Sequence, residues 1–123
     1  MANPSILVVD DELLIRDLLY DFFSGQGWDI TVADNGEAAL TILRDKEFDL
    51  ILTDIKMPEM DGLTLTERVR VDYPDLPVIV MTGYPSVDSA VQALRSKVED
   101  YIIKPFNINQ LYKVIEGKIR ESD

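Results

Sequence analysis

Four short apolar runs of this chain end at polar residues that could do chemistry together. Asp10 and Asp11 follow the first run, and Asp54, Thr82 and Lys104 end or follow three later runs. Three neighbouring carboxylates repel one another unless a cation joins them, and hard cations such as Mg²⁺ prefer oxygen ligands. A lysine and a hydroxyl group beside such a cation could bind the oxygens of a phosphoryl group. An aspartate can also accept a phosphoryl group itself, as an acyl phosphate.

Each of these residues also has an ordinary structural interpretation. Asp10 and Asp11 could cap the helix expected after them, because aspartate accepts hydrogen bonds from free amides at a helix start. Asp54 precedes a segment rich in proline, aspartate and glycine and could belong to a turn. The threonine and the lysine carry little information alone. Together, at the ends of successive runs, the residues are harder to explain by structure, and Asp54 stays open as a turn residue, a metal ligand or a nucleophile.

The composition excludes several classes of function. The chain has no histidine and no cysteine, which removes Ser-His-Asp and Cys-His mechanisms, imidazole metal sites and disulfides. A metal would have to be held by oxygens, which favours Mg²⁺, Mn²⁺ or Ca²⁺. The net charge of −11 disfavours direct binding to nucleic acid or to an anionic membrane. With no long apolar run and no signal peptide pattern, we expect a cytoplasmic protein.

The elements that must position the polar residues alternate along the chain. Continuous runs of apolar or β-branched residues at 6–9, 50–53 and 78–81 predict strands buried on both faces. Residues 28–32 alternate as an edge strand would, and residues 101–103 predict a short fifth strand. A helical pattern follows each strand, which is typical of an α/β fold with a parallel sheet and helices on both faces. Ligand sites in such sheets lie at the carboxyl ends of the strands, so the polar residues should converge there.

Apolar spacing also predicts which face some helices bury. In the first helix the i, i+4, i+8 stripe predicts that Leu14, Leu18 and Phe22 face the core, with Ile15 and Leu19 beside them. The fourth helix is expected from an i, i+3, i+4, i+7 pattern formed by Val87, Ala90, Val91 and Leu94.

Four motifs occur in order along the chain: Val8-Val9-Asp10-Asp11-Glu12, Asp54-Ile55-Lys56-Met57-Pro58-Glu59-Met60-Asp61-Gly62, Met81-Thr82-Gly83 and Asp100-Tyr101-Ile102-Ile103-Lys104-Pro105-Phe106. With these motifs the sequence resembles the receiver domains of two-component response regulators over nearly its whole length. The resemblance implies a three-layer flavodoxin-like (βα)5 fold with five parallel strands in the order 2-1-3-4-5. It also implies one receiver domain over residues 1–123, and we expect no effector domain within them.

The resemblance assigns roles to the polar residues. It implies that Asp54 is the phosphoacceptor and, with Asp11, a ligand of Mg²⁺, with Mn²⁺ as an alternative. Asp10 would act on the metal through water, and the main-chain carbonyl of Lys56 would complete the protein ligands. Lys104 and the switch residue Thr82 would hold the phosphoryl group.

The resemblance also implies a switch and a set of partners. Thr82 would move toward the phosphoryl group, and Tyr101 would turn inward into the space that it leaves. The surface of the fourth helix, fifth strand and fifth helix would then change and contact an effector domain or protein partner. The phosphoryl donor would be a sensor histidine kinase or a histidine phosphotransfer protein, as part of a phosphorelay.

Three features are specific to this chain or depend on its structure. The resemblance implies a cis peptide bond before Pro105. Lys97 stands where receivers often carry glycine, so the turn there either takes an unfavourable backbone conformation or differs in shape. Tyr84 and Lys56 each stand two residues after a site residue, and we expect them to restrict water and lengthen the phosphorylated state.

Two other classes of function compete with this interpretation. An aspartyl phosphatase of the haloacid dehalogenase type would need a second acid two residues after the nucleophile, and Lys56 occupies that position. A receiver-like interaction module could keep the fold and signal without phosphorylation, although every site residue is present. We expect a phosphoacceptor that assists its own phosphorylation and dephosphorylation and is otherwise not an enzyme.

Overall fold

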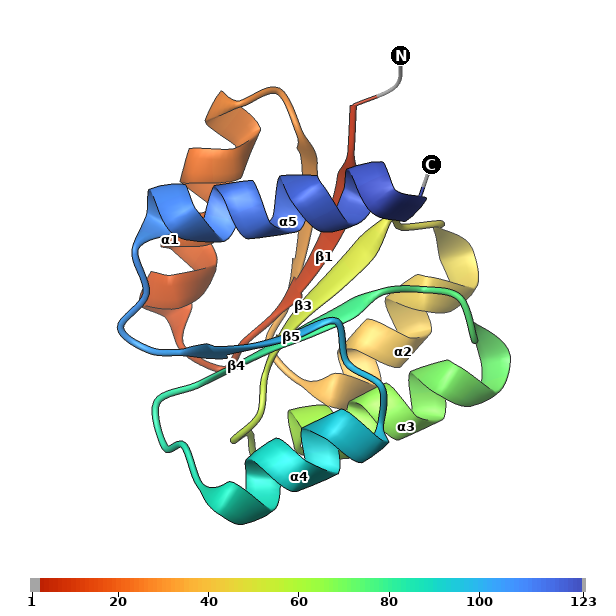
Figure 1. Cartoon of the computed structure of the whole chain (residues 1–123). Coiled ribbons are helices and arrows are strands. Elements are labelled where there is room, and N and C mark those ends of the chain that lie inside the picture. Colours follow the sequence, from red (N-terminus) through yellow and green to blue (C-terminus); the bar gives the residue numbers. More distant parts are fainter. Residues whose placement is uncertain (1–2, 123) are drawn as a thin grey trace.

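A computed structural model describes residues 3–122, in which five parallel strands form one sheet in the order β2-β1-β3-β4-β5 (Figure 1). Strand and helix alternate along the chain, and each helix returns the chain for the next parallel strand. The strands are β1 Ser5–Val9, β2 Asp29–Ala33, β3 Leu50–Asp54, β4 Val78–Thr82 and β5 Asp100–Ile103. The helices are α1 Leu13–Gly25, α2 Gly36–Asp45, α3 Gly62–Asp72, α4 Val87–Arg95 and α5 Ile108–Ser122.

The helices cover both faces of the sheet and make three layers, as predicted. Helices α1 and α5 lie on one face, and α2, α3 and α4 lie on the other (Figure 1). Side chains of successive strand residues point to opposite faces, so Ile6 and Val8 pack with α1 and α5 while Leu7 and Val9 pack on the other side. This explains why the central strands are continuously apolar: neither face meets water.

The predicted core-facing stripe of α1 is wrong for Leu14 and Leu18. Leu14 is 81% exposed and Leu18 is exposed as well, whereas Leu19 and Phe23 are fully buried. Ile15 and Phe22 pack partly against the core, as expected. The exposed pair Leu14 and Leu18 and the buried pair Leu19 and Phe23 have the same helical spacing, so periodicity alone does not choose between them. The rotation of the helix follows from Phe23, which packs against an aromatic group formed with Trp28 and Tyr112.

Helix α4 forms where the apolar pattern predicts it, but its apolar stripe faces outward. Val87 is 80% exposed and Leu94 is 78% exposed, and Ala90 and Val91 are exposed between them. Ala93 is the residue of α4 that is buried in the described chain. The stripe is therefore an apolar surface of the molecule and not part of its core.

Across the residues that the structure describes, we find no helix with the length and apolar character needed to cross a membrane.

Candidate phosphoacceptor site at the carboxyl edge of the sheet

The ends of four neighbouring strands bring the predicted polar residues to one edge of the sheet. Asp10 directly follows β1, Asp54 and Thr82 end β3 and β4, and Lys104 directly follows β5. A pocket of about 390 Å³ opens at this edge. The pocket is lined by Asp11, Glu12, Asp54, Lys56, Gly83, Tyr84 and Lys104. The convergence expected from the alternating elements is confirmed.

Lys104 joins three carboxylates at this edge. Its Nζ atom donates a hydrogen bond to Asp10 Oδ2 at 2.8 Å and lies 3.4 Å from Asp54 Oδ2. Glu12 Oε1 lies 3.5 Å from the same nitrogen. Burial lowers the pKa of Lys104, but the hydrogen bond and charge of Asp10, together with Asp54 and Glu12, outweigh it and raise the pKa above its ordinary value. The ammonium group therefore stays charged.

Asp10 is fully buried, and its contacts place it below the pocket rather than at the start of α1. Its second carboxylate oxygen accepts the backbone amide of Glu12 at 2.9 Å, and Arg16 donates to its main-chain carbonyl at 2.8 Å. The residue before α1 is Glu12, and no side-chain cap is formed there within the described chain. The helix-cap interpretation of Asp10 and Asp11 is therefore wrong. The buried Asp10 carboxylate is balanced by Lys104 instead.

Asp54 is a nearly buried carboxylate with an altered affinity for protons. Burial raises the pKa of Asp54 to about 6, the charge of Asp10 adds to the rise, and Lys104 opposes it. At pH 7 the ionised form still predominates. The Asp54 carboxylate thus lies close to the ammonium group of Lys104, but the neighbouring Asp10 carboxylate and the burial of Asp54 outweigh the stabilisation that Lys104 gives its charge.

The donor set at this edge fits a hard divalent cation. Asp10, Glu12 and Asp54 each offer one oxygen, and these oxygens all lie within 4.8 Å of one another. Carboxylate oxygens are the ligands that Mg²⁺ and Mn²⁺ prefer. Glu12 was not predicted as a site residue from the sequence, although Glu12 is the third acid in the run that begins at Asp10. Asp11 is exposed and lines the pocket beside this group.

The loop after β3 is closed tightly against Asp54. The amide of Gly62 donates to the carbonyl of Ile55 at 2.7 Å, and Asp61 caps α3 by accepting the amide of Thr64. A Cβ atom at Gly62 would lie 2.0 Å from the main-chain oxygen of Asp54. Only glycine therefore permits this approach, and the turn that follows Asp54 holds the backbone of the carboxylate in place.

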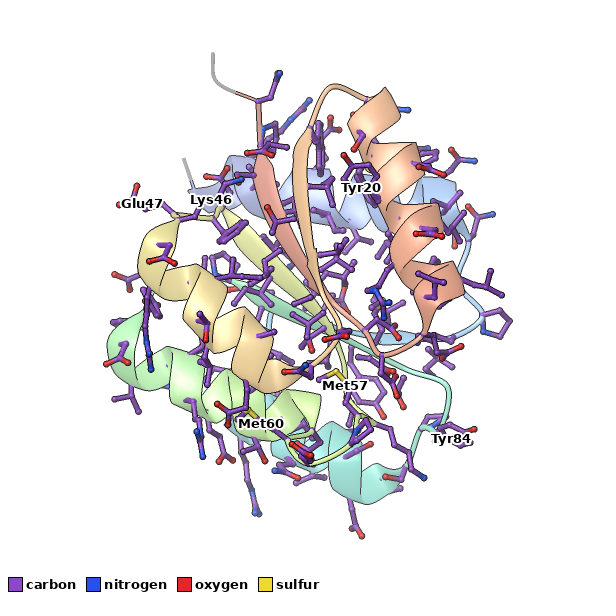
Figure 2. The ribbon with its side chains drawn as sticks, turned by 180° about the vertical axis from the view of Figure 1, so that it is seen from behind. Tyr20, Lys46, Glu47, Met57, Met60 and Tyr84 are labelled. Carbon is purple, nitrogen blue, oxygen red and sulfur yellow. The ribbon has the colours of Figure 1, made fainter. Side chains whose placement is uncertain are left out.

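Thr82 ends β4, and Tyr84, two residues later, lines the pocket. Thr82 is buried, and its hydroxyl oxygen accepts the backbone amide of Tyr84 at 3.0 Å. The Tyr84 side chain projects from the β4–α4 loop (Figure 2), and the ammonium group of Lys56 lies 4.6 Å from the centre of its ring. This cation–π pair joins the two loops that border the pocket.

The two backbone features expected near β5 are both resolved by the structure. The peptide bond between Lys104 and Pro105 is cis, as the resemblance implied. Lys97 adopts the left-handed conformation, with φ of 59°. Its amide donates to Leu94 and the amide of Val98 donates to Ala93, which is the glycine-type ending of a helix. The turn thus keeps its shape, and the lysine accepts the unfavourable backbone conformation.

The comparisons with known proteins agree with this geometry. The family model described as response regulator receiver domain matches residues 6–116. Over 119 residues the chain is 42% identical to the regulatory protein AtoC of Escherichia coli K12, a match that covers 97% of this chain and 26% of AtoC. The chain spans about a quarter of the length of the curated relatives that it matches.

Solved structures also resemble the chain. A CheY-like response regulator receiver domain protein from Methanospirillum hungatei JF-1 has a TM-score of 0.95 and 31% identity, covering 98% of this chain and 97% of that one. The response regulator TrrA from Thermotoga maritima, solved in complex with Mg²⁺-BeF, has a TM-score of 0.84 and 33% identity, covering 94% and 98%.

Proposed function

The chain belongs to the response regulator receiver domain family, and on that premise we propose that Asp54 accepts the phosphoryl group through which it signals. The observation that carries the proposal is the position of the Asp54 carboxylate. It is nearly buried at a strand end, at the wall of an open pocket, with the ammonium group of Lys104 3.4 Å away. A turn residue would need neither the burial nor the cation.

The proposed reaction transfers a phosphoryl group from a phosphohistidine to Asp54. The bond between phosphorus and the imidazole nitrogen breaks, its electron pair stays on that nitrogen, and a carboxylate oxygen of Asp54 forms the new bond to phosphorus. The donor histidine lies outside these 123 residues, which contain none. We assign it to a sensor histidine kinase or a histidine phosphotransfer protein. The nucleophile must be ionised, and a pKa of about 6 leaves Asp54 mostly ionised at pH 7.

Lys104 and Thr82 would hold the transferred group. Lys104 is already charged and close to Asp54, so it can bind a phosphoryl oxygen without a large movement. The hydroxyl of Thr82 would donate to another oxygen, which requires it to leave the amide of Tyr84. These two residues supply charge and a hydrogen bond but form no covalent bond.

A divalent cation, Mg²⁺ or Mn²⁺, would be held at the same edge. We assign Asp11 and Asp54 as direct ligands, with Asp10 acting through water and the main-chain carbonyl of Lys56 completing the set. The cluster of carboxylate oxygens that includes Glu12 supports a cation here. When bound, such a cation supplies positive charge for the phosphoryl oxygens.

The output would be read on the surface of α4, β5 and α5. Its supporting feature is the apolar stripe of α4, in which Val87 and Leu94 are largely exposed. Tyr101 on β5 would act as the second switch residue beside Thr82. An effector domain or a protein partner would bind this surface, and the domain itself would assist its own phosphorylation and hydrolysis rather than turn over a substrate.

Intact-mass measurement after incubation with acetyl phosphate and Mg²⁺ tests the proposal. The wild-type protein should gain the mass of one phosphoryl group, and the gain should disappear in EDTA and in Asp54→Asn. Asp17→Asn, which removes an exposed carboxylate from α1, is the matched control and should be phosphorylated normally. No gain by the wild-type protein with Mg²⁺ present would instead support an interaction module that works without phosphorylation.

A further inference from the structure

Three hydroxyl groups link the start of α4 to Tyr101 on β5. The hydroxyl oxygens of Ser86 and Ser89 lie 3.0 Å apart, and that of Ser89 lies 2.7 Å from the phenol oxygen of Tyr101. Ser86 is the N-cap of α4 and accepts the amide of Ser89 at 3.0 Å. The side chain of Tyr101 is half-buried and packs against the core on the α2–α4 side of the sheet.

Ser89 takes part in the N-terminal cap of α4 and in the bond to Tyr101 at the same time. A serine hydroxyl donates one hydrogen bond and accepts two. Ser89 donates to the main-chain carbonyl of Ser86 at 3.2 Å and accepts from the hydroxyl of Ser86. Its bond to the phenol of Tyr101 can run in either direction, because each hydroxyl can donate and accept. The phenol is therefore held toward α4, and the same serine that holds it is part of the first turn of that helix.

We propose that Ser89 is a positioning residue that holds the Tyr101 phenol at the start of α4, away from the space beside Thr82, and thereby sets how readily the site accepts a phosphoryl group. This inference rests on the proposed function and deepens it by naming the residue that regulates the switch. An inward turn of Tyr101 breaks its bond to Ser89. A movement of Tyr101 would thus act directly on the first turn of α4, because Ser89 belongs to that turn. The same helix carries the exposed apolar stripe.

Thr82 is restrained at the other end of the same segment. Its hydroxyl is engaged by the amide of Tyr84, in the loop that leads to Ser86 and α4. In the state that the structure shows, both switch residues are therefore bound to residues 84–89. Loss of a single neutral hydrogen bond changes the ratio of two conformations by about fivefold. A ligand that prefers the inward state then binds more tightly by the same factor.

Titration with beryllofluoride at a fixed Mg²⁺ concentration tests the inference, with the backbone amide signal of Gly83 as the NMR readout. Ser89→Ala should lower the apparent Kd about fivefold, and Ser89→Thr, which keeps the hydroxyl, should restore the wild-type value. Ser24→Ala on α1 is the control and should bind as the wild type does. The substitution at Ser89 keeps the backbone amide that Ser86 caps, so α4 should still form.

A double-mutant cycle with Tyr101→Phe separates this role from a general effect on α4. If the two hydroxyls act through their mutual bond, Ser89→Ala should change the apparent Kd much less in the Tyr101→Phe background than in the wild type. If the fold-changes in apparent Kd of the two single variants simply multiply in the double variant, the inference is overturned. It is also overturned if Ser89→Ala leaves the apparent Kd unchanged. Neither outcome affects Asp54 as the proposed acceptor. Failure of the wild-type protein to bind beryllofluoride would overturn the proposed function and this inference with it.

Discussion

Replacing Asp54 with asparagine should stabilise the metal-free protein at neutral pH, even though it removes the proposed acceptor. The carboxylate is nearly buried, lies beside Asp10 and is only partly balanced by Lys104. Asparagine has almost the same shape and no charge. The substitution therefore removes an electrostatic penalty without opening a cavity in the core.

The size and pH range of the effect follow from the two pKa values of Asp54. Folding raises the pKa from 3.8 to about 6, so between these values the folded state binds more protons than the unfolded state. The free energy of unfolding of the wild-type protein must therefore fall as the pH rises from 3.8 to about 6. One pKa unit corresponds to about 1.4 kcal/mol, so the total contribution is about 3 kcal/mol. The asparagine variant escapes this loss.

Urea unfolding in EDTA, followed by the fluorescence of Trp28, measures the difference. Trp28 is the single tryptophan of the chain, is buried and packs against Phe23 at a ring-centre distance of 5.1 Å, so its emission should change on unfolding. Asp54→Asn should exceed the wild type by about 2–3 kcal/mol at pH 7.5 and match it near pH 4. The exposed control Asp17→Asn should stay within about 0.5 kcal/mol at both pH values. An equal gain at both pH values, or no gain at pH 7.5, would refute the electrostatic reasoning.

Three further predictions test individual turns and loops of the chain. Gly62→Ala should destabilise the protein by at least about 2 kcal/mol in urea unfolding, because its Cβ would collide with the backbone of Asp54, whereas Gly117→Ala on α5 meets no atom within 4 Å and should be neutral or stabilising. Lys97→Gly should raise the free energy of unfolding by about 1 kcal/mol, because it relieves a left-handed lysine; a loss of stability would contradict the assigned turn. Tyr84→Ala should shorten the half-life of the phosphorylated protein, measured by intact mass after removal of acetyl phosphate, because water then reaches the pocket; an unchanged half-life would show that Tyr84 and Lys56 do not restrict water.

The strands were predictable because burial on both faces leaves a simple pattern, whereas their order followed from the resemblance to receiver domains. Residues 6–9, 50–53 and 78–81 are apolar or β-branched without interruption, and all three runs lie in strands of the sheet. The polar residue at the end of each run then marks the edge where ligands bind. The strand positions and the site location therefore depended on short local patterns that tertiary contacts did not alter.

The rotation of helices was not predictable in the same way. In α1 two neighbouring sets of apolar residues have equally good spacing, and the choice depends on Trp28 and Tyr112, which lie elsewhere in the chain. The bond between Ser89 and Tyr101 has no periodic signal at all, because serines are common at helix starts for local reasons. Glu12 could have been found, since it continues an acidic run, but its contact with Lys104 spans 92 positions.

Helix α4 shows why one hydrogen bond is able to decide a conformation here. Most of the stability of a helix in a protein comes from packing of its apolar face. Within the described chain α4 buries Ala93 alone, whereas α1 buries the larger side chains of Leu19 and Phe23. Weakly packed segments are the ones that move at small free-energy differences. A hydrogen bond contributes about 1 kcal/mol, which weighs more on a helix that buries one small side chain than on one that buries several large ones. We infer that the outward apolar stripe and the bond from Ser89 to Tyr101 belong to one arrangement, in which α4 packs weakly enough for the site to move it.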